Sequence, residues 1–183
     1  DYLLHSGDKW ENRLLKEVCT MAVQDADNRI WVVSQNSVWC PDGNQGKEIP
    51  LPDGMDAPRC VYWGHNGILY IGTAFGLYYW DGGWHVAEQL NGICVNDIVS
   101  DAAKRLYVAT TNGLWRKDQD RWVNLDDTVM PIGNDRKYFA VAVGNHGKDV
   151  FFSTPHSIAC IAADGYHHAW SAADGLPYGP AQL

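Results

Sequence analysis

Residues 68–84 have the sequence ILYIGTAFGLYYWDGGW, and most of the chain repeats the pattern of this stretch. Residues 69–71 are a short run of β-branched and aromatic side chains, which predicts a strand, and residues 73–76 predict a hairpin connection. Residues 77–80 predict the returning strand, and residues 81–83 predict a turn into a third strand that begins with a tryptophan. The stretch therefore predicts consecutive antiparallel strands joined by tight turns.

The same pattern occurs three more times. The copies are RIWVVSQNSVW from Arg29, RLYVATTNGLW from Arg105 and DVFFSTPHSIA from Asp149. Their first core residues follow one another at intervals of 39, 37 and 44 residues, namely Ile30, Leu69, Leu106 and Val150. A repeat of about 40 residues with four short antiparallel strands per copy is the signature of β-propeller blades. One blade has two apolar faces and must stack between neighbours to bury them.

The repeat predicts an all-β fold, a β-propeller built of four-stranded antiparallel blades. The N-terminal stretch matches only the second half of the pattern, so we expect about four full blades plus a partial one. Propeller rings commonly have about four to eight blades, and we expect this chain to be a segment of a larger propeller. The expected units are the outer strands of a partial blade at residues 1–17, blades at residues 18–55, 56–92, 93–130 and 131–172, and a linker into a next blade at residues 173–183.

Tryptophan recurs after the outer turn of four copies, at Trp10, Trp84, Trp122 and Trp170. A β-sandwich would not need the same residue at the same place in each copy, so this recurrence favours a propeller. We expect these rings to pack in the wedges between blades, away from the axis, rather than to form sugar-binding platforms.

The composition argues against several classes of function. With 14 basic and 22 acidic residues, the chain has a formal charge of −8, which disfavours binding to nucleic acid or to an anionic membrane surface. No stretch approaches the roughly 18 consecutive apolar residues of a membrane span, and no basic-then-apolar leader opens the chain. We expect this segment itself to make no membrane contact.

No local motif of an enzyme or a metal site is present in the sequence. It contains no Gly-rich phosphate loop, GxSxG elbow, HExxH or CxxC. The adjacent His167 and His168 would point to opposite faces of a strand and could not readily share one ion. The cysteines are expected to be buried thiols rather than disulfides, and they are Cys19, Cys40, Cys60, Cys94 and Cys160. We therefore predict no catalytic residue, no metal and no cofactor.

Two kinds of turn are predicted from their residues. Asp25, Asp27 and Asp101 are expected to bond nearby backbone amides with their side chains, as turn formers rather than calcium ligands. Asn112 and Gly113 form the Asn-Gly pair that is typical of a type I′ hairpin turn, in which both central residues have positive φ.

The repeats resemble a known family. Residues 95–122, VNDIVSDAAKRLYVATTNGLWRKDQDRW, are similar to the two-component-regulator propeller repeat, as are VCTMAVQDADNRIWVVSQNSVWCPDG and ILYIGTAFGLYYWDG less fully. Residues 154–157, TPHS, depart from the Thr-x-Asn-Gly of that pattern, and Ser37 replaces its glycine. The resemblance implies a periplasmic or extracellular sensor domain of a hybrid histidine kinase or related regulator, and it is compatible with a homodimer through the full-length receptor. The signalling role rests on the proteins in which this repeat commonly occurs, and fold alone does not fix function.

A binding surface is expected where the lead-in segments and the turns between second and third strands share one face around the axis. The side chains at these turns vary, although turn chemistry alone would favour asparagine at each. Asp97 is also a candidate, because it is the only carboxylate in a first strand; capping a turn or pairing with a neighbouring blade is the other explanation for it. The candidate ligand-binding residues are Arg59, Phe75, Asn96, Asp97, Asn112, Tyr138 and His156.

These observations predict a ligand-sensing module that binds a carbohydrate or another small polar molecule. A protein–protein interaction scaffold and a propeller lyase or hydrolase are the alternatives. A clustered polar pocket at the axis would support the sensor, and an exposed apolar face would support the scaffold. A metal near a histidine or carboxylate would support the enzyme, whose active site could be assembled across blades without leaving a local motif.

Overall fold

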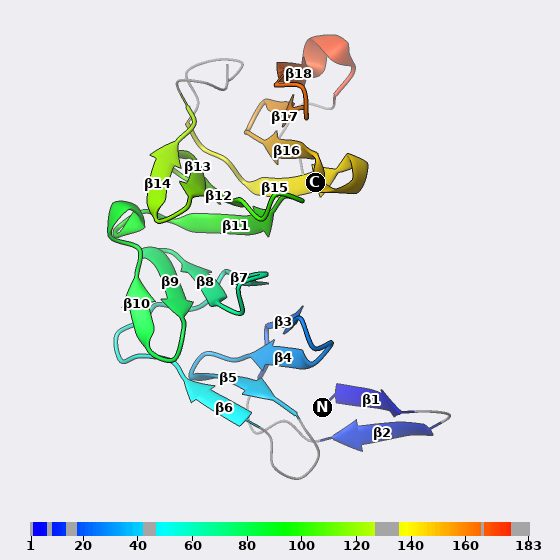
Figure 1. Ribbon diagram of the computed structural model, residues 1–183, viewed down its shortest axis with the longest axis vertical. Coiled ribbons are helices and arrows are strands. Elements are labelled where there is room, and N and C mark those ends of the chain that lie inside the picture. Colours follow the sequence, from blue (N-terminus) through cyan, green and yellow to red (C-terminus); the bar gives the residue numbers. More distant parts are fainter. Residues whose placement is uncertain are drawn as a thin grey trace. The chain divides into compact units, whose positions relative to one another are not determined.

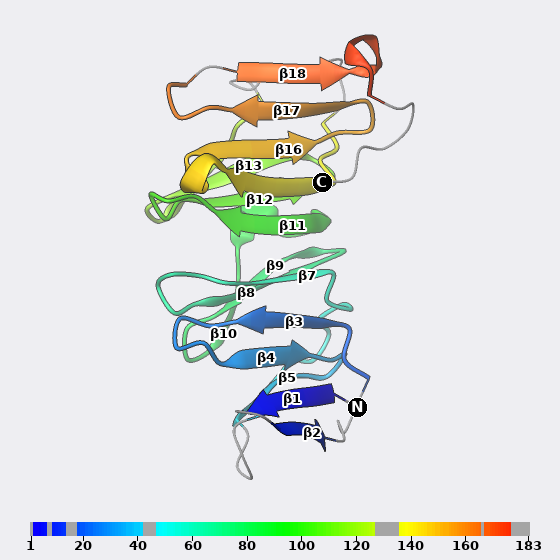
Figure 2. The ribbon, with the colours of Figure 1, turned by 90° about the vertical axis from the view of Figure 1, so that its right-hand side faces the viewer.

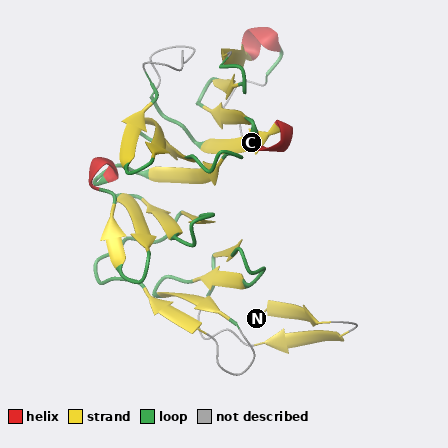
Figure 3. Cartoon of the chain, in the orientation of Figure 1, coloured by secondary structure: helices red, strands yellow, loops and turns green. Residues whose placement is uncertain are grey.

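The computed structural model describes residues 2–6, 9–13, 18–41, 47–126, 136–165 and 167–176. These residues form four four-stranded antiparallel sheets and one two-stranded hairpin. Figure 3 draws their strands in yellow. The chain divides into two compact units, Asp1–Leu51 and Pro52–Leu183, and each is described by itself. None of the described helices is long and apolar enough to cross a membrane. The fold is all-β, as the repeat predicts.

The first unit contains the hairpin and one sheet. Strands β1 and β2 pair along their whole length, and the sheet has the strand order β3-β4-β5-β6 (Figure 1). The bounds are β1 Tyr2–Ser6, β2 Lys9–Arg13, β3 Met21–Gln24, β4 Ile30–Val33, β5 Ser37–Cys40 and β6 Lys47–Pro50.

The second unit contains three sheets, each formed by four strands consecutive in the sequence (Figure 2). Strand β11 contacts β7 of the preceding sheet and β15 of the following one, so the first strands of the three sheets are neighbours. This is the stacking of consecutive propeller blades. The strands are β7 Cys60–Trp63, β8 Leu69–Thr73, β9 Gly76–Trp80, β10 Trp84–Val86, β11 Val95–Ser100, β12 Leu106–Thr110, β13 Gly113–Asp118, β14 Arg121–Asn124, β15 Ala140–Gly144, β16 Asp149–Ser153, β17 Ser157–Ile161 and β18 His167–Ser171. Three short 3₁₀ helices are η1 Glu88–Leu90, η2 Asn145–Gly147 and η3 Ala172–Asp174.

Two apolar clusters hold the three sheets of the second unit together. One joins the sheets β7–β10 and β11–β14 and includes Leu77, Val108 and Trp122. The other joins β11–β14 to β15–β18, where the ring of Tyr138 meets Phe152 edge-on at 5.5 Å between centroids. Fully burying each such side chain stabilises a fold by about 1.5–3 kcal/mol. The sheet β11–β14 contributes one face to each cluster and each flanking sheet contributes a face to one of them, so the alternation of side chains along the strands positions the sheets.

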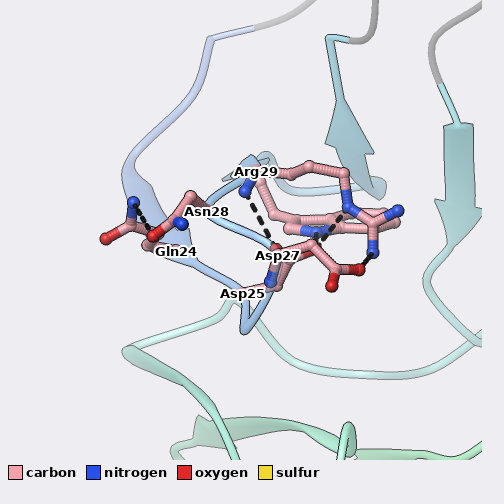
Figure 4. A network of polar contacts seen from close by, with 6 residues as sticks. Gln24, Asp25, Asp27, Asn28 and Arg29 are labelled. Atoms are coloured by element: carbon pink, nitrogen blue, oxygen red, sulfur yellow. Dashed lines mark hydrogen bonds and ion pairs between the residues drawn. The ribbon is translucent and has the colours of Figure 1, made fainter.

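Asp25 and Asp101 form turns as predicted and share a repeated arrangement, whereas the carboxylate of Asp27 bonds the side chain of Arg29 rather than a backbone amide. Asp25 Oδ1 accepts hydrogen bonds from the backbone N–H groups of Asp27 and Arg29, both at 2.9 Å. Its Oδ2 accepts from Arg29 Nε at 2.7 Å and Trp31 Nε1 at 2.8 Å. Figure 4 shows this network, in which the side-chain amide of Gln24 also donates to Asn28 Oδ1. We call the aspartate, arginine and aromatic residue the carboxylate clamp.

The clamp recurs in the sheet β11–β14. Asp101 Oδ1 accepts from the backbone N–H of Arg105 at 2.9 Å, and Oδ2 accepts from Arg105 Nε at 2.6 Å and from the hydroxyl of Tyr107 at 3.3 Å. Asp25 and Asp101 are both buried, and in each clamp the arginine satisfies the buried carboxylate. A buried carboxylate is tolerated when it is paired and hydrogen-bonded in this way.

The hairpin turn predicted at Asn112 and Gly113 is of a different type. Thr110 pairs with Gly113, so the central residues are Thr111 and Asn112, and of these residues only Gly113 has positive φ, at 113°. A type I′ turn needs positive φ at both central residues, and neither Thr111 nor Asn112 has it. The prediction of a hairpin is correct, whereas its predicted type is wrong.

The recurring tryptophans do not all pack as predicted. Trp122 is buried in the first cluster, and Trp84 is partly buried, with its ring 5.4 Å edge-on from Trp80. Trp170 is 37% exposed and stacks on His168, so the packing prediction is wrong for this residue. The side chain of Trp10 lies outside the described part of the structure.

The cysteines are thiols, as predicted, and three of them, Cys40, Cys60 and Cys160, are buried. Burial raises the pKa of the Cys60 thiol to about 12, since the thiolate would lose its hydration. A thiol with such a pKa is not a nucleophile at neutral pH.

Candidate functional site

In each four-stranded sheet, a hydroxyl side chain that ends the second strand or directly follows it holds the next turn. In the sheet β7–β10, Thr73 Oγ1 accepts from the backbone N–H of Phe75 at 3.1 Å and donates to the carbonyl of Gly76 at 3.2 Å. The equivalent residues in the other sheets make the same pair of bonds with the residues two and three positions on. They are Ser34, Thr110 and Thr154.

This geometry places three of the predicted candidates at equivalent positions in three different turns. Phe75, Asn112 and His156 each occupy the second central position of the turn, and the hydroxyl binds their backbone and not their side chains. All three are exposed, Phe75 to 64%. The turns therefore present three different side chains, one apolar, one amide and one imidazole, at the same ends of three adjacent sheets.

The lead-in segments meet the same strand ends. The backbone N–H of Arg59 donates to the carbonyl of Gly72 at 2.8 Å, and that of Tyr138 donates to the carbonyl of Thr110 at 2.8 Å. These bonds place the lead-in segments beside the ends of second strands. We call the exposed set Arg59, Phe75, Asn112 and His156 the recognition edge.

Asn96 links the three sheets of the second unit at this edge. Its Oδ1 accepts from a guanidinium nitrogen of Arg59 at 3.5 Å, and its Nδ2 donates to the backbone carbonyl of Tyr138 at 2.7 Å. The pairing of β11 with β12 shifts register between Val95 and Asp97, which places Asn96 at a β-bulge. A bulge re-aims a side chain out of the regular alternation, and here it turns the amide toward both neighbouring sheets.

Tyr138 lies inside the fold and Asp97 is half-buried, so neither belongs to the exposed set. The carboxylate of Asp97 accepts from the backbone N–H of Ile98 at 2.9 Å and of Val141, on the next sheet, at 3.0 Å. Burial raises the pKa of Asp97, and these two hydrogen bonds oppose the rise. Tyr138 is fully buried. Asp97 joins two sheets, and the part of Tyr138 that meets Asn96 is its backbone carbonyl.

The sequence interpretation missed the turn hydroxyls and the bulge. A signal for the hydroxyls was available, because aligning the copies places serine or threonine at positions 34, 73, 110 and 154. The four residues are buried polar groups, each satisfied by its own turn. The bulge has no comparable signal, since it depends on how β11 pairs with its partner strand.

Within the described ranges, no group of three His, Cys, Asp or Glu side chains could hold a metal ion. His85 Nε2 lies 2.9 Å from Asp81, an exposed pair at the turn between β9 and β10. The recognition edge is instead a set of hydrogen-bonding, cationic and aromatic groups. Its chemistry suits binding of a polar molecule by side chains on rigid turns.

No protein-family model and no curated protein sequence matches the chain. Among solved structures it resembles the extracellular domain of a hybrid two-component system protein of B. thetaiotaomicron, with a TM-score of 0.73 and 16% identity over 97% of this chain and 27% of that one. It also resembles virginiamycin B lyase from Staphylococcus aureus, in an inactive form with quinupristin, with a TM-score of 0.63 and 11% identity over 82% of this chain and 54% of that one. A third similar structure is YCF48 bound to D1 peptide, with a TM-score of 0.65 and 12% identity over 93% of this chain and 60% of that one.

The comparisons establish the fold as a β-propeller. The chain spans between about a quarter and three fifths of the length of these three structures. The same fold carries an extracellular domain of a two-component system, a lyase and a peptide-bound protein, so function must be argued from this chain's own residues.

Proposed function

We propose that this chain is a ligand-binding part of an extracytoplasmic sensor propeller, and that the recognition edge binds a carbohydrate or another small polar molecule. The observation that carries the proposal is the convergence at Asn96, where a side chain at a bulge connects Arg59 of one sheet to the backbone of another. A ligand bound to Arg59 would therefore contact a group already coupled to three sheets. The extracellular location of the similar two-component domain supports the placement outside the cytoplasm.

The side chains of the recognition edge suit such a ligand. The guanidinium of Arg59 is exposed and offers several N–H donors. Phe75 offers an exposed aromatic ring, and Asn112 offers an amide that can donate and accept. Sugar hydroxyls need both donors and acceptors, and the faces of sugar rings pack on aromatic rings.

A binding screen with mono- and disaccharides by isothermal titration calorimetry tests the proposal. A saccharide that binds the wild-type chain should bind Arg59→Ala at least tenfold more weakly, about 1.4 kcal/mol. Arg121→Ala is the matched control, because Arg121 is also exposed but begins β14 at the opposite strand ends. Absence of any binding saccharide, or equal affinities for wild type and Arg59→Ala, would overturn the proposal.

A protein-interaction scaffold is the second candidate, favoured by the exposed ring of Phe75. Aromatic side chains are enriched in the centres of protein interfaces. The similar structure of YCF48 holds a peptide. Selection of a displayed peptide library on the wild-type chain, with counter-selection on Phe75→Ala, distinguishes the two: peptides that require Phe75 would support the scaffold, and their absence would exclude it.

A further inference from the structure

The sheet β7–β10 lacks the carboxylate clamp. Gly64 stands in place of the clamp aspartate and Ile68 in place of the arginine, whereas Tyr70 keeps the aromatic position. The turn itself is preserved, since the backbone N–H of Gly64 donates to the carbonyl of Ile68 at 2.8 Å, as Asp101 does to Arg105 at 3.1 Å. What the sheet has lost is therefore two side chains and not the backbone that carries them.

A cleft is present where those side chains are missing. It lies between the sheets β7–β10 and β11–β14 and has a volume of about 650 Å³. The corresponding cleft between β11–β14 and β15–β18, where the clamp of Asp101 is intact, has about 350 Å³. Both volumes fall in the range of small-molecule sites, about 300–1,000 Å³, and the cleft without the clamp is the larger of the two. It lies at the strand ends opposite the recognition edge.

The walls of the cleft are aromatic and polar. Tyr62 and Ser100, from facing sheets, bond through their hydroxyls across it. The remaining lining comes from the turns of both sheets, chiefly His65, Asn66, Ile68, Lys104 and Asp120. A molecule in this space would meet hydroxyl, amide and imidazole groups.

Among the described residues, the charges around the cleft leave one half-buried cation without an ion pair, while Lys104 and Asp120 are exposed charges of opposite sign at its rim. Arg105 is bonded to its clamp aspartate, and Asp118 receives two hydrogen bonds of 2.6 Å from Arg116. Lys117 also lines the cleft and is half-buried, and within the described ranges no carboxylate forms an ion pair with it. Its ammonium is therefore the charge that a ligand could neutralise.

Three aromatic rings hold this ammonium in place. Lys117 Nζ lies 5.8 Å from the ring centre of Tyr70, 5.6 Å from that of Tyr79 and 5.9 Å from that of Trp122. Such cation–π contacts contribute about 0.5–1 kcal/mol each at exposed sites and more when desolvated. They compensate the charge in part and leave the N–H donors without a carboxylate partner.

A lysine is not required at this position for the sheets to pack. Lys117 pairs with Leu106, the first core residue of its copy. The residues at the same register in the flanking sheets are Trp80 and Ile161, which are apolar. The lysine therefore takes the place of an apolar residue at the one pair of sheets where the missing clamp has opened a cleft.

We propose that this cleft is a second binding site, which takes a small hydroxylated carboxylic acid with its carboxylate on the ammonium of Lys117. A carboxylate is compact and satisfies the donors of Lys117 through charge-assisted hydrogen bonds. The exposed Lys104 adds positive charge at the rim, and Asn66 and the hydroxyl pair of Tyr62 and Ser100 are partners for ligand hydroxyls.

Glucuronate and glucose are the probes, because they share a ring and differ in the carboxylate. In ¹H–¹⁵N spectra of the whole chain, glucuronate should shift the amides of residues 64–68 and 100–105 in a saturable titration, and glucose should not. Lys117→Met, which keeps an unbranched side chain and removes the ammonium, should weaken glucuronate binding at least tenfold. Lys148→Met is the matched control and should bind as the wild type does, because Lys148 lies on the other cleft.

Lys104→Glu keeps the test decisive even if Lys117→Met is poorly folded. Lys104 is exposed, so its reversal leaves the core intact and should weaken glucuronate binding several-fold. Failure of glucuronate to shift these amides, equal shifts with glucose, or unchanged affinity in both variants would each overturn the proposal. The site is independent of the recognition edge, and Arg59→Ala should bind glucuronate like the wild type.

Discussion

The turn before β12 and the turn before β8 share the same backbone hydrogen bond, but only the first carries the side chains of the carboxylate clamp. In the first, Asp101, Arg105 and Tyr107 form a closed set of hydrogen bonds around one buried carboxylate. In the second, Gly64 and Ile68 leave Tyr70 beside a cleft and an ammonium from the next sheet. The difference teaches that the clamp is not needed to form the turn. Its side chains fill space between sheets, and removing them creates a cavity without disturbing the strands.

The largest effect is expected from breaking a clamp that is intact. Asp25→Ala removes four hydrogen bonds and leaves the indole N–H of Trp31 buried, so we expect a loss of about 3 kcal/mol in the free energy of unfolding. Asp27→Ala is the control, because its carboxylate is 70% exposed and bonds the same Arg29 at 2.8 Å. It should cost about 0.5 kcal/mol or less. Equal losses in urea unfolding of the two variants would contradict a role for burial.

A second prediction concerns the other end of the sheet β7–β10. Gly72 occupies the register of Ala109 in the next sheet, but a Cβ added to it would lie 2.5 Å from Val95 Cγ1 and closer still to Cys60 Sγ. Gly72→Ala should therefore overpack the core and cost about 1–3 kcal/mol. Gly83→Ala, whose Cβ would meet only His85 at 3.8 Å, should leave the thermal midpoint unchanged. A neutral Gly72→Ala would show that the two sheets can separate at this point.

The third prediction separates binding from stability in the cleft. If Lys117 stands at an apolar position, Lys117→Met should change the free energy of unfolding by less than about 1 kcal/mol, since methionine retains the contacts with the rings and loses only the cation–π term. Chemical denaturation measures this. A loss above about 2 kcal/mol would mean that the ammonium is structural.

The last prediction concerns pH, whose effects on stability have opposite signs at two aspartates. Burial alone would raise the pKa of Asp25, but hydrogen bonds from Trp31, Arg29 and the backbone outweigh it and lower the pKa to about 2. Stability from Asp25 is therefore present above about pH 4, near its unfolded pKa, and is lost as the pH falls toward 2. The pKa of Asp97 is raised, so its contribution is largest below about pH 4 and declines as the pH rises through its folded pKa.

Carboxyl ¹³C shifts followed by NMR during an acid titration report both groups. Asp25 should titrate below the usual range of aspartates and Asp97 above it. A raised pKa at both residues would contradict the hydrogen bonding of Asp25, and a lowered pKa at both would contradict the effect of burial on Asp97.

The strands could be predicted from the sequence because the repeat fixes their period. The strands expected at residues 69–71 and 77–80 are observed as Leu69–Thr73 and Gly76–Trp80. The exposed candidates Phe75 and His156 could also be predicted, because turn residues between strands face solvent. The half-buried position of Asp97 and the buried position of Tyr138 could not, since they depend on the bulge at Asn96 and on contacts between sheets. The cleft could not be predicted from the sequence either, because it lies where one copy lacks the aspartate and arginine of the clamp.

The hydroxyl turns have a consequence for how such a protein can change. Thr73, Thr110 and Thr154 bind the backbone of the residue two positions on, so the turn is indifferent to the side chain there. A mutation at residue 75, 112 or 156 alters what the surface displays at little cost in folding free energy. Each sheet thus keeps the same turn backbone while the exposed side chain on it can change. Binding preference can therefore change through substitutions in one sheet at a time.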